Sequence, residues 1–205
     1  MTDQQLREDI CEIGRRVWQL GMAPANAGNI SARLADETVL CTPTGVSKGF
    51  MQPADLVLLR LDGHPLGPGQ VSSESQLHLT CYRERPDIGG VVHVHPPVAT
   101  GFACSNRALP VDILTEAVCL LGEVPTVAPA TPGTPEVPAA LAPHLSGAVA
   151  FLLANHGALT LGGDVWEAFH RMEVLEHAAQ VALAALQAGG LRPIPEAMLE
   201  KLARP

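Results

Sequence analysis

The chain has 205 residues, of which 47% are hydrophobic and 17% charged, and its formal net charge is −8. These values are typical of a globular protein with a sizeable core, and they exclude a disordered or fibrous chain. The negative charge argues against a nucleic-acid partner, but a phosphorylated small molecule could still be held by backbone N–H groups and hydroxyls.

The sequence also lacks the usual signals for export or membrane insertion. Its first residues do not have the basic-then-apolar order of a secretory signal, and the longest apolar run, residues 148–154, is far shorter than the roughly 20 residues that span a bilayer. The five cysteines are scattered and form no C-x-x-C pair, which is typical of reduced thiols. We therefore expect a cytoplasmic protein with no membrane partner.

An amphipathic helix is predicted at the start of the chain, with Thr2 or Asp3 as its N-cap and Gly21 at its end. Its apolar residues recur at helical spacing: Leu6, Ile10, Ile13, Val17 and Leu20. Short strand-like runs follow and predict strands over residues 29–34, 38–42 and 56–61.

The rest of the chain mixes helices and strands. The pattern predicts, in order, a helix over residues 75–85, strands over residues 91–95, 148–154 and 158–161, a long helix from residue 164 to about 187, and a short helix over residues 195–203. Pro86 ends the first of these helices, Pro96 and Pro97 stop the strand before them, and Asp164 is the expected N-cap of the long helix.

The Pro- and Gly-rich stretch over residues 125–143 resembles a boundary between domains. The apolar pattern resumes after it without a shift in composition, so we interpret it as a long functional loop inside one domain. The spacing of the strands is too irregular for repeated βαβ units. The sequence therefore predicts a single α/β domain over residues 1–205.

The sharpest local signal for chemistry is His93-Val94-His95. Side chains alternate along a strand, so both imidazoles point to the same face and can reach one ion. His156, in the turn Asn155-His156-Gly157, would complete the three protein ligands of a catalytic zinc site. Each histidine alone could equally be an ordinary polar residue at a strand end or turn, and the combination favours a metal site.

Ser72, Ser73 and Glu74 lead into the predicted helix over residues 75–85. Hydroxyls at this place can cap the helix or bind phosphate oxygens, and Glu74 could be a general base, a metal ligand or a solvated residue of a capping box. Two glycine turns, over residues 26–31 and 42–45, could also present N–H groups to an anion, although any turn has such residues.

Two further residue types, lysine and histidine, bear on the choice of catalytic mechanism and of site residues. Only two lysines are present, so a Schiff-base mechanism would have to use Lys48, and metal-assisted chemistry is favoured instead. His78, on the helix after Glu74, could approach the site, but we expect it to be a structural residue.

Five motifs in this order resemble the class II aldolase/adducin family, in particular its aldolases of ketose 1-phosphates such as L-fuculose 1-phosphate. They are G-N-I-S at residues 28–31, T-P-T-G at 42–45, S-S-E at 72–74, H-V-H at 93–95 and N-H-G at 155–157. The resemblance implies a three-layer α/β/α fold with a mainly antiparallel central sheet. It also implies a homotetramer with active sites between subunits.

The resemblance further implies the roles of individual residues. One Zn²⁺ per chain would be held by His93, His95 and His156, with Glu74 as a ligand of the free metal and then as acid/base. The phosphate-binding positions would be Asn29, Thr44, Gly45, Ser72 and Ser73. The expected reaction is cleavage of a ketose 1-phosphate to dihydroxyacetone phosphate and a short aldehyde, through an enediolate that the metal stabilises.

The chain departs from those aldolases at two tyrosines, one of which, near their C-terminus, has no counterpart here. Where they use a tyrosine from a neighbouring subunit, this chain has Leu114, and its one tyrosine, Tyr82, is expected to be structural. Glu116, two residues after Leu114, is the candidate replacement acid, although a solvated or capping role fits it equally.

Two alternatives to the aldolase remain open at the level of sequence. One is a related enzyme with the same metal site: a pentulose-phosphate 4-epimerase, a sugar-acid phosphate decarboxylase or a thiosugar-phosphate dehydratase. The other is an adducin-like binding module without catalysis, which would not need the three histidines and Glu74 that this chain retains. Imidazole ligands also accept divalent ions other than zinc.

Overall fold

The structure, a computed structural model, describes residues 2–34 and 37–202. The strands are β1 (Asn29–Arg33), β2 (Thr38–Cys41), β3 (Val57–Arg60), β4 (Gly90–Val94), β5 (Thr126–Val127), β6 (Ala150–Leu153) and β7 (Gly157–Gly162). The helices are α1 (Asp3–Gln19), α2 (Ser75–Glu84), α3 (Pro97–Ala103), α4 (Thr115–Leu120), α5 (Glu136–Leu141), α6 (Val165–Gln187) and α7 (Glu196–Leu202), with short 3-10 helices η1 (Lys48–Phe50), η2 (Pro53–Asp55) and η3 (Ala142–His144). The predicted α/β class is confirmed.

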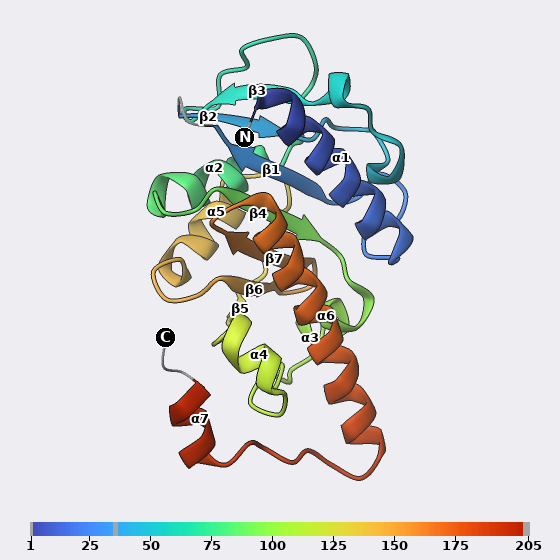
Figure 1. The fold of residues 1–205 in the computed structure, drawn as a ribbon, viewed down its shortest axis with the longest axis vertical. Coiled ribbons are helices and arrows are strands. Elements are labelled where there is room, and N and C mark those ends of the chain that lie inside the picture. The colour runs from blue at the N-terminus through green and yellow to red at the C-terminus, as the bar shows by residue number, and fades with distance from the viewer. Residues whose placement is uncertain (1, 35–36, 203–205) are drawn as a thin grey trace.

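The strands form one sheet in the order β3-β2-β1-β4-β7-β6-β5 (Figure 1). Neighbouring strands pair antiparallel except at one edge, where β5 runs parallel to β6. This parallel pair arises because the chain leaves β5 through α5 and η3 and returns in the same direction, as a helical crossover requires. The sheet is therefore mixed, and the expected antiparallel pairing holds for every pair of neighbouring strands except β5 and β6.

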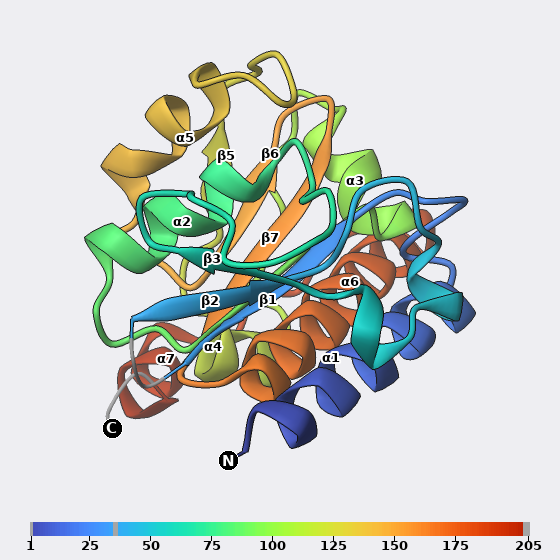
Figure 2. The same cartoon turned by 90° about the horizontal axis from the view of Figure 1, so that it is seen from above.

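Helices cover both faces of the sheet (Figure 2). The alternation of side chains along β4 shows how the two faces differ: Val92 and Val94 pack into the core that includes α1, α3 and α6, whereas Val91 packs into the core beneath α2 and α5. His93 lies on the same face of β4 as Val91. The sheet thus directs His93 towards the α2 side of the molecule.

The first helix forms as predicted, with one difference at its end. Thr2 is the N-cap, and its Oγ1 accepts a hydrogen bond of 3.2 Å from the backbone N–H of Gln5. The predicted apolar stripe is buried as far as Val17, but Leu20 is 51% exposed. Leu20 is the C-cap residue and still bonds through its N–H to the carbonyl of Arg16, but it lies at the end of the helix, where the core does not cover it.

The main errors of the sequence prediction lie in the segment that it treated as irregular. Residues 125–143 are not a structureless loop, because they contain β5 and α5, and Val137 and Leu141 of α5 are core residues. The short helices α3 and α4 were not predicted. The predicted last helix begins one residue later, at Glu196, and Ala203 lies outside the described residues.

Among the described residues, no helix has both the length and the apolar composition required to cross a bilayer.

Gly28 sets how closely the chain before β1 can approach β4. Its φ is +76°, and a Cβ atom there would lie 2.9 Å from the carbonyl oxygen of His93 and 2.9 Å from Cγ1 of Val94. Gly21 has a similar φ of +72° but no atom within 4 Å of such a Cβ. An added Cβ would therefore cause backbone strain at both positions, but a steric clash only at Gly28.

We expect Gly28→Ala to destabilise the fold more than Gly21→Ala. Both variants have the cost of a left-handed alanine, about 1–2 kcal/mol, and only Gly28→Ala adds an overpacking cost of about 1–3 kcal/mol. Urea unfolding of the two variants beside the wild type, all in the same metal state, measures the difference. Equal losses of unfolding free energy in the two variants would show that the backbone at His93 can shift to accommodate the added methyl group without a measurable energetic cost.

Candidate metal centre

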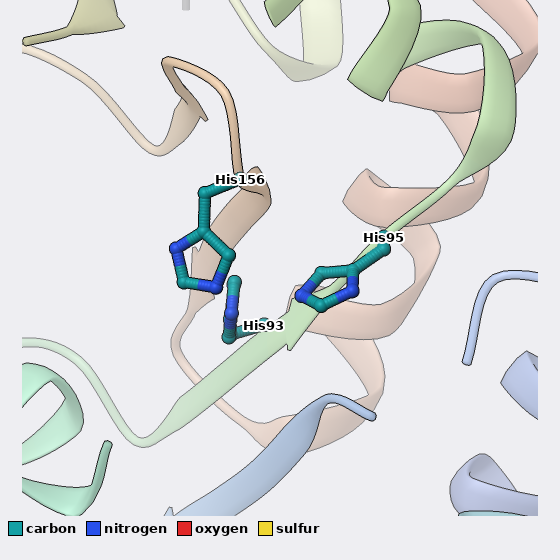
Figure 3. Close-up of side chains that lie close together, drawn as sticks. All are labelled: His93, His95 and His156. Carbon is teal, nitrogen blue, oxygen red and sulfur yellow. The ribbon is translucent and has the colours of Figure 1, made fainter. Parts of the chain in front are cut away.

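Three histidines, two from β4 and its end and one from a distant turn, converge at the end of β4. His93 lies in β4, His95 lies just after it, and His156 lies in the turn between β6 and β7 (Figure 3). Their ring centroids are 5.2 Å apart for His93 and His95, 4.7 Å for His93 and His156, and 5.1 Å for His95 and His156. One ligand nitrogen from each lies within 4.8 Å of the others. We call this group the histidine cluster.

Local backbone geometry orients the cluster. Because β7 pairs with β4, the turn before β7 is carried to the end of β4, and Asn155 in that turn adopts a left-handed φ of 58°, which asparagine tolerates. The backbone N–H of His95 donates to the carbonyl of Met22 at 2.8 Å. Nδ1 of His93 donates to the carbonyl of Ala158 at 2.8 Å, which leaves its Nε2 free to face the cluster.

Glu74 completes the group from the N-terminus of α2. Its carboxylate oxygens lie 3.3 Å from Nε2 of His93 and 3.4 Å from Nε2 of His156. Although Glu74 is the N-cap residue of α2, its side chain makes no capping hydrogen bond. Its carboxylate instead accepts a hydrogen bond of 3.2 Å from the amide nitrogen of Asn29. The solvated capping role that the sequence left open for Glu74 is therefore not what the structure shows.

The protonation states of these groups suit a cation. Burial alone would raise the pKa of Glu74, but the neighbouring His93, His156 and the Asn29 amide lower it to about 2. Burial, followed by the other two histidines, lowers the pKa of His95 to about 4, and burial also lowers the pKa of His156. At neutral pH the site thus has an ionised carboxylate at Glu74 and neutral imidazoles at His95 and His156, which are the forms that bind metals.

The cluster also has unused hydrogen-bonding capacity. Nε2 of His93, Nε2 of His95 and Oε1 of Glu74 are buried, and no hydrogen-bond partner of good geometry reaches them from the described residues. Buried polar atoms in native proteins are almost always satisfied, so atoms left without partners need an explanation. A divalent ion coordinated by these nitrogens and the carboxylate would satisfy them, and the residues therefore fit a metal site.

A second feature adjoins the cluster. The five residues predicted to bind phosphate line one cavity of about 150 Å³ together with Glu74 and His95. We call this cavity the loop pocket; its predicted phosphate residues are Asn29, Thr44, Gly45, Ser72 and Ser73. A hydrogen bond of 2.9 Å from Thr44 N to Gln70 O ties the loop of Thr44 and Gly45 to the loop of Ser72 and Ser73. The structure thus brings all of these residues to one side of the histidine cluster.

Lys48 also lines the loop pocket, which the sequence did not predict. It is 1% exposed, and its ammonium donates to the carbonyls of Val46 at 2.7 Å and Asn26 at 3.1 Å. Burial lowers the pKa of Lys48 to about 8. The scarcity of lysine in the sequence drew attention to Lys48. Only the fold, however, shows that this cation lies beside the proposed phosphate site.

Glu116 is not brought to the histidine cluster within one chain. It lies in the first turn of α4, exposed, where its carboxylate accepts a hydrogen bond of 2.9 Å from Thr115. Leu114 precedes the same helix as its N-cap residue. Tyr82 is buried, its hydroxyl is bonded to Ser31, and burial raises its pKa well above the ordinary value. A catalytic role for Glu116 stays a prediction, and it would need a second copy of the chain.

Comparison with known proteins identifies relatives over most of the chain. A profile of the Class II Aldolase and Adducin N-terminal domain matches residues 8–183. A 3-oxo-tetronate 4-phosphate decarboxylase from Escherichia coli O6:H1 is 35% identical over 88% of this chain and 87% of its own. A 5-deoxy-D-ribulose 1-phosphate aldolase from Bacillus thuringiensis is 32% identical over 100% of this chain and 96% of its own.

Solved structures of similar proteins point to the same family. YgbL from Klebsiella pneumoniae, described as an aldolase/epimerase/decarboxylase, is 32% identical with a TM-score of 0.93, over 98% of this chain and 99% of its own. An L-fuculose 1-phosphate aldolase is 27% identical with a TM-score of 0.89, over 97% of this chain and 94% of its own. An L-fuculose 1-phosphate aldolase is thus among the solved structures that the chain resembles, as the sequence motifs implied. The chain belongs to the class II aldolase and adducin family.

Proposed function

We propose that this protein is a metal-dependent decarboxylase of a 3-oxo sugar-acid phosphate, of which 3-oxo-tetronate 4-phosphate is the best candidate. The observation that carries the proposal is the position of Glu74, which adjoins the histidine cluster on one side and the loop pocket on the other. Relatives named as decarboxylases of this compound support the choice of substrate. This proposal replaces the cleavage of L-fuculose 1-phosphate expected from the sequence.

The two parts of the proposed site would bind different groups of the substrate. The loop pocket would hold the phosphate through the hydroxyls of Thr44, Ser72 and Ser73, with Lys48 as a nearby positive charge. This remote contact would place the 3-oxo group at the histidine cluster and fix the reacting carbons. A divalent ion held by the cluster would supply a Lewis acid for that carbonyl oxygen.

Decarboxylation breaks the bond between carbons 1 and 2 and releases carbon 1 as CO₂. The electron pair left on carbon 2 delocalises onto the carbonyl oxygen, and carbon 2 then takes up one proton to give dihydroxyacetone phosphate. We assign this proton transfer to Glu74, whose carboxylate faces the cluster and also lines the loop pocket. The net reaction consumes one proton from solvent for each CO₂ released.

The groups of the site favour decarboxylation over aldol cleavage. Release of an aldehyde requires a second group to take the proton from the departing hydroxyl, whereas CO₂ leaves without one. Among the described residues of one chain, Glu74 is the carboxylate at the cluster, and Tyr82 is buried in a hydrogen bond to Ser31. The one proton-transfer group that a single chain places at the cluster is enough for the decarboxylase, whereas the aldolase would need a second group from a neighbouring subunit.

Aldol cleavage of a 5-deoxypentulose 1-phosphate is the second candidate. The Bacillus thuringiensis aldolase aligns with the whole of this chain. This reaction would give the same enediolate, so it would use the same cluster and loop pocket. Glu116 of a neighbouring subunit would then have to serve as the second proton-transfer group.

The proposal extends to the metal and the assembly. Three imidazoles with one carboxylate are typical ligands of zinc, so we propose Zn²⁺ at one ion per chain, although other divalent ions also accept such ligands. The resemblance to the family's tetrameric aldolases is the basis for proposing a homotetramer with interfacial sites. A phosphosugar enzyme of this kind is also expected in the cytoplasm.

Product analysis separates the candidates. Zinc-loaded protein would be incubated with 3-oxo-tetronate 4-phosphate, 5-deoxy-D-ribulose 1-phosphate and L-fuculose 1-phosphate. Each productive reaction yields dihydroxyacetone phosphate, while CO₂ marks the decarboxylase and an aldehyde marks an aldolase. We expect CO₂ and dihydroxyacetone phosphate from the oxo acid in equal amounts.

Chelator-treated protein and a protein-free sample are the controls, because 3-oxo acids also lose CO₂ spontaneously. Acetaldehyde from the deoxypentulose phosphate, with oxo-acid decay no faster than in the controls, would establish the aldolase instead.

A further inference from the structure

A buried chain of polar side chains connects α2 to β1 behind the proposed metal site. The Tyr82 hydroxyl lies 2.9 Å from Oγ of Ser31, and that oxygen lies 2.6 Å from Nδ1 of His78. Nε2 of His78 makes a short hydrogen bond with Oδ1 of Asn29. These four side chains are at most 4% exposed, so water does not compete for their hydrogen bonds.

Asn29 joins this chain to the proposed site. Its Nδ2 donates to Oε2 of Glu74 and to Oγ of Ser72, each at 3.2 Å. Asn29 also lies opposite His93 in the pairing of β1 with β4, so its side chain emerges on the same face of the sheet. One amide thus contacts the proposed acid/base, the loop pocket and His78.

The hydrogen-bond acceptors around Asn29 determine which atom donates in each hydrogen bond of this buried row of side chains. An ionised carboxylate can only accept, so the NH₂ group of Asn29 faces Glu74 and its Oδ1 faces His78. His78 must therefore donate from Nε2, and a neutral imidazole then has to accept at Nδ1. The donor there is the Ser31 hydroxyl, whose oxygen accepts in turn from Tyr82.

A neutral His78 is consistent with its surroundings. Burial, followed by the nearby His93, lowers the pKa of His78 to about 3. Its two ring nitrogens already have one donor and one acceptor partner, so a second proton would require the Ser31 hydroxyl to turn and accept at Nδ1, which reverses its hydrogen bond with Tyr82.

We propose that His78 is a positioning residue that fixes the amide orientation of Asn29 and thereby holds the Glu74 carboxylate against the histidine cluster. The inference rests on the proposed function only for the role of Glu74. With the other tautomer, Nε2 of His78 would be an acceptor and the Asn29 amide would turn over. Oδ1 would then face the Glu74 carboxylate, acceptor against acceptor, and Glu74 would move away from the cluster.

The tautomer of His78 can be measured directly. In zinc-loaded, ¹⁵N-histidine-labelled protein, long-range ¹H–¹⁵N correlations distinguish Nε2–H from Nδ1–H imidazoles, and the signal that disappears in His78→Gln identifies His78. We expect the Nε2–H form. A predominant Nδ1–H form would overturn the proposal, whatever reaction the protein catalyses.

Zinc affinity, measured by titration without any substrate, tests the consequence for Glu74. His78→Leu removes the donor to Asn29, and we expect it to weaken zinc binding by about 10–100-fold, the usual effect of losing a group that orients a ligand. His78→Gln can donate to Oδ1 from its own amide and should recover most of the loss. Tyr82→Phe removes a hydroxyl of equal burial at the far end and should bind zinc as the wild type does.

A purely structural role for His78 predicts a different pattern. His78→Gln would then bind zinc as poorly as His78→Leu, or a folded His78→Leu would bind it normally, and either result would overturn the proposal. If His78→Leu does not fold, the tautomer of the wild-type protein still decides. Because zinc affinity and tautomer need no substrate, a wrong proposed function would leave both measurements interpretable.

Discussion

Replacing His93 with alanine is expected to remove the bound metal and to lower turnover at least about a thousandfold. A Lewis-acid metal contributes several kcal/mol of charge stabilisation, and each 1.36 kcal/mol is a factor of ten in rate. Nε2 of His93 lies at the centre of the site, 3.3 Å from Glu74 and buried without a hydrogen-bond partner of good geometry. Elemental analysis should find about one divalent ion per wild-type chain and almost none in the variant.

His93 is fully buried, so His93→Ala could act through folding as well as through the metal. His156→Ala removes a second ligand from a partly exposed turn, and it should lose the metal with less effect on the fold. The exposed His64 provides the matched control, since His64→Ala should keep both metal and activity. A full complement of metal in folded His93→Ala and His156→Ala would mean that the cluster is not the metal site.

The histidine cluster could be predicted because its signals are local. Alternation along a strand places His93 and His95 on one side, and N-H-G marks a turn that follows a buried strand. What the sequence could not establish is that β4 and β7 are neighbours, because strand order depends on long-range packing. The resemblance to the family supplied the shared ligand set instead, without the strand order.

Glu74 and His78 show where local interpretation fails. A glutamate before a helix predicts a capping role, and a histidine one turn later predicts packing. Their actual partners, His93 and Asn29, come from strands that the sequence alone does not place beside α2. Residues whose function depends on contacts between distant elements are the ones that the sequence left ambiguous.

The fold was predicted well where elements are long and poorly where they are short. α1 and α6 have 17 and 23 residues, enough turns for an apolar stripe or a capped run to be visible. α5 has 6 residues and includes Pro138, which normally argues against a helix, although proline is tolerated in a first turn. Its Val137 and Leu141 are buried by tertiary contacts that no local pattern encodes.

Replacing Glu74 with glutamine is expected to weaken metal binding, because an anionic ligand is lost, and in zinc-saturated protein to slow proton transfer at carbon by about 10²–10⁴-fold, the usual contribution of a general acid or base. Glutamine has nearly the same shape and can still face His93 and His156, but it cannot carry a proton. Since the decarboxylase and the aldolase share one enediolate, the measurement is hydrogen–deuterium exchange of dihydroxyacetone phosphate in D₂O, followed by NMR on zinc-loaded protein. The exposed Glu123→Gln is the matched control.

The same exchange assay also tests the role of the second candidate carboxylate, Glu116. Exchange involves only carbon, so Glu116→Gln should leave it unchanged whether or not Glu116 of another subunit takes part in catalysis. Under the proposed decarboxylase, Glu116→Gln should also leave CO₂ release unchanged, because CO₂ departs without a proton; an aldolase that uses Glu116 would lose aldehyde release. Normal exchange in zinc-loaded Glu74→Gln would remove Glu74 from the chemistry and would leave the proton transfer to a residue outside the cluster.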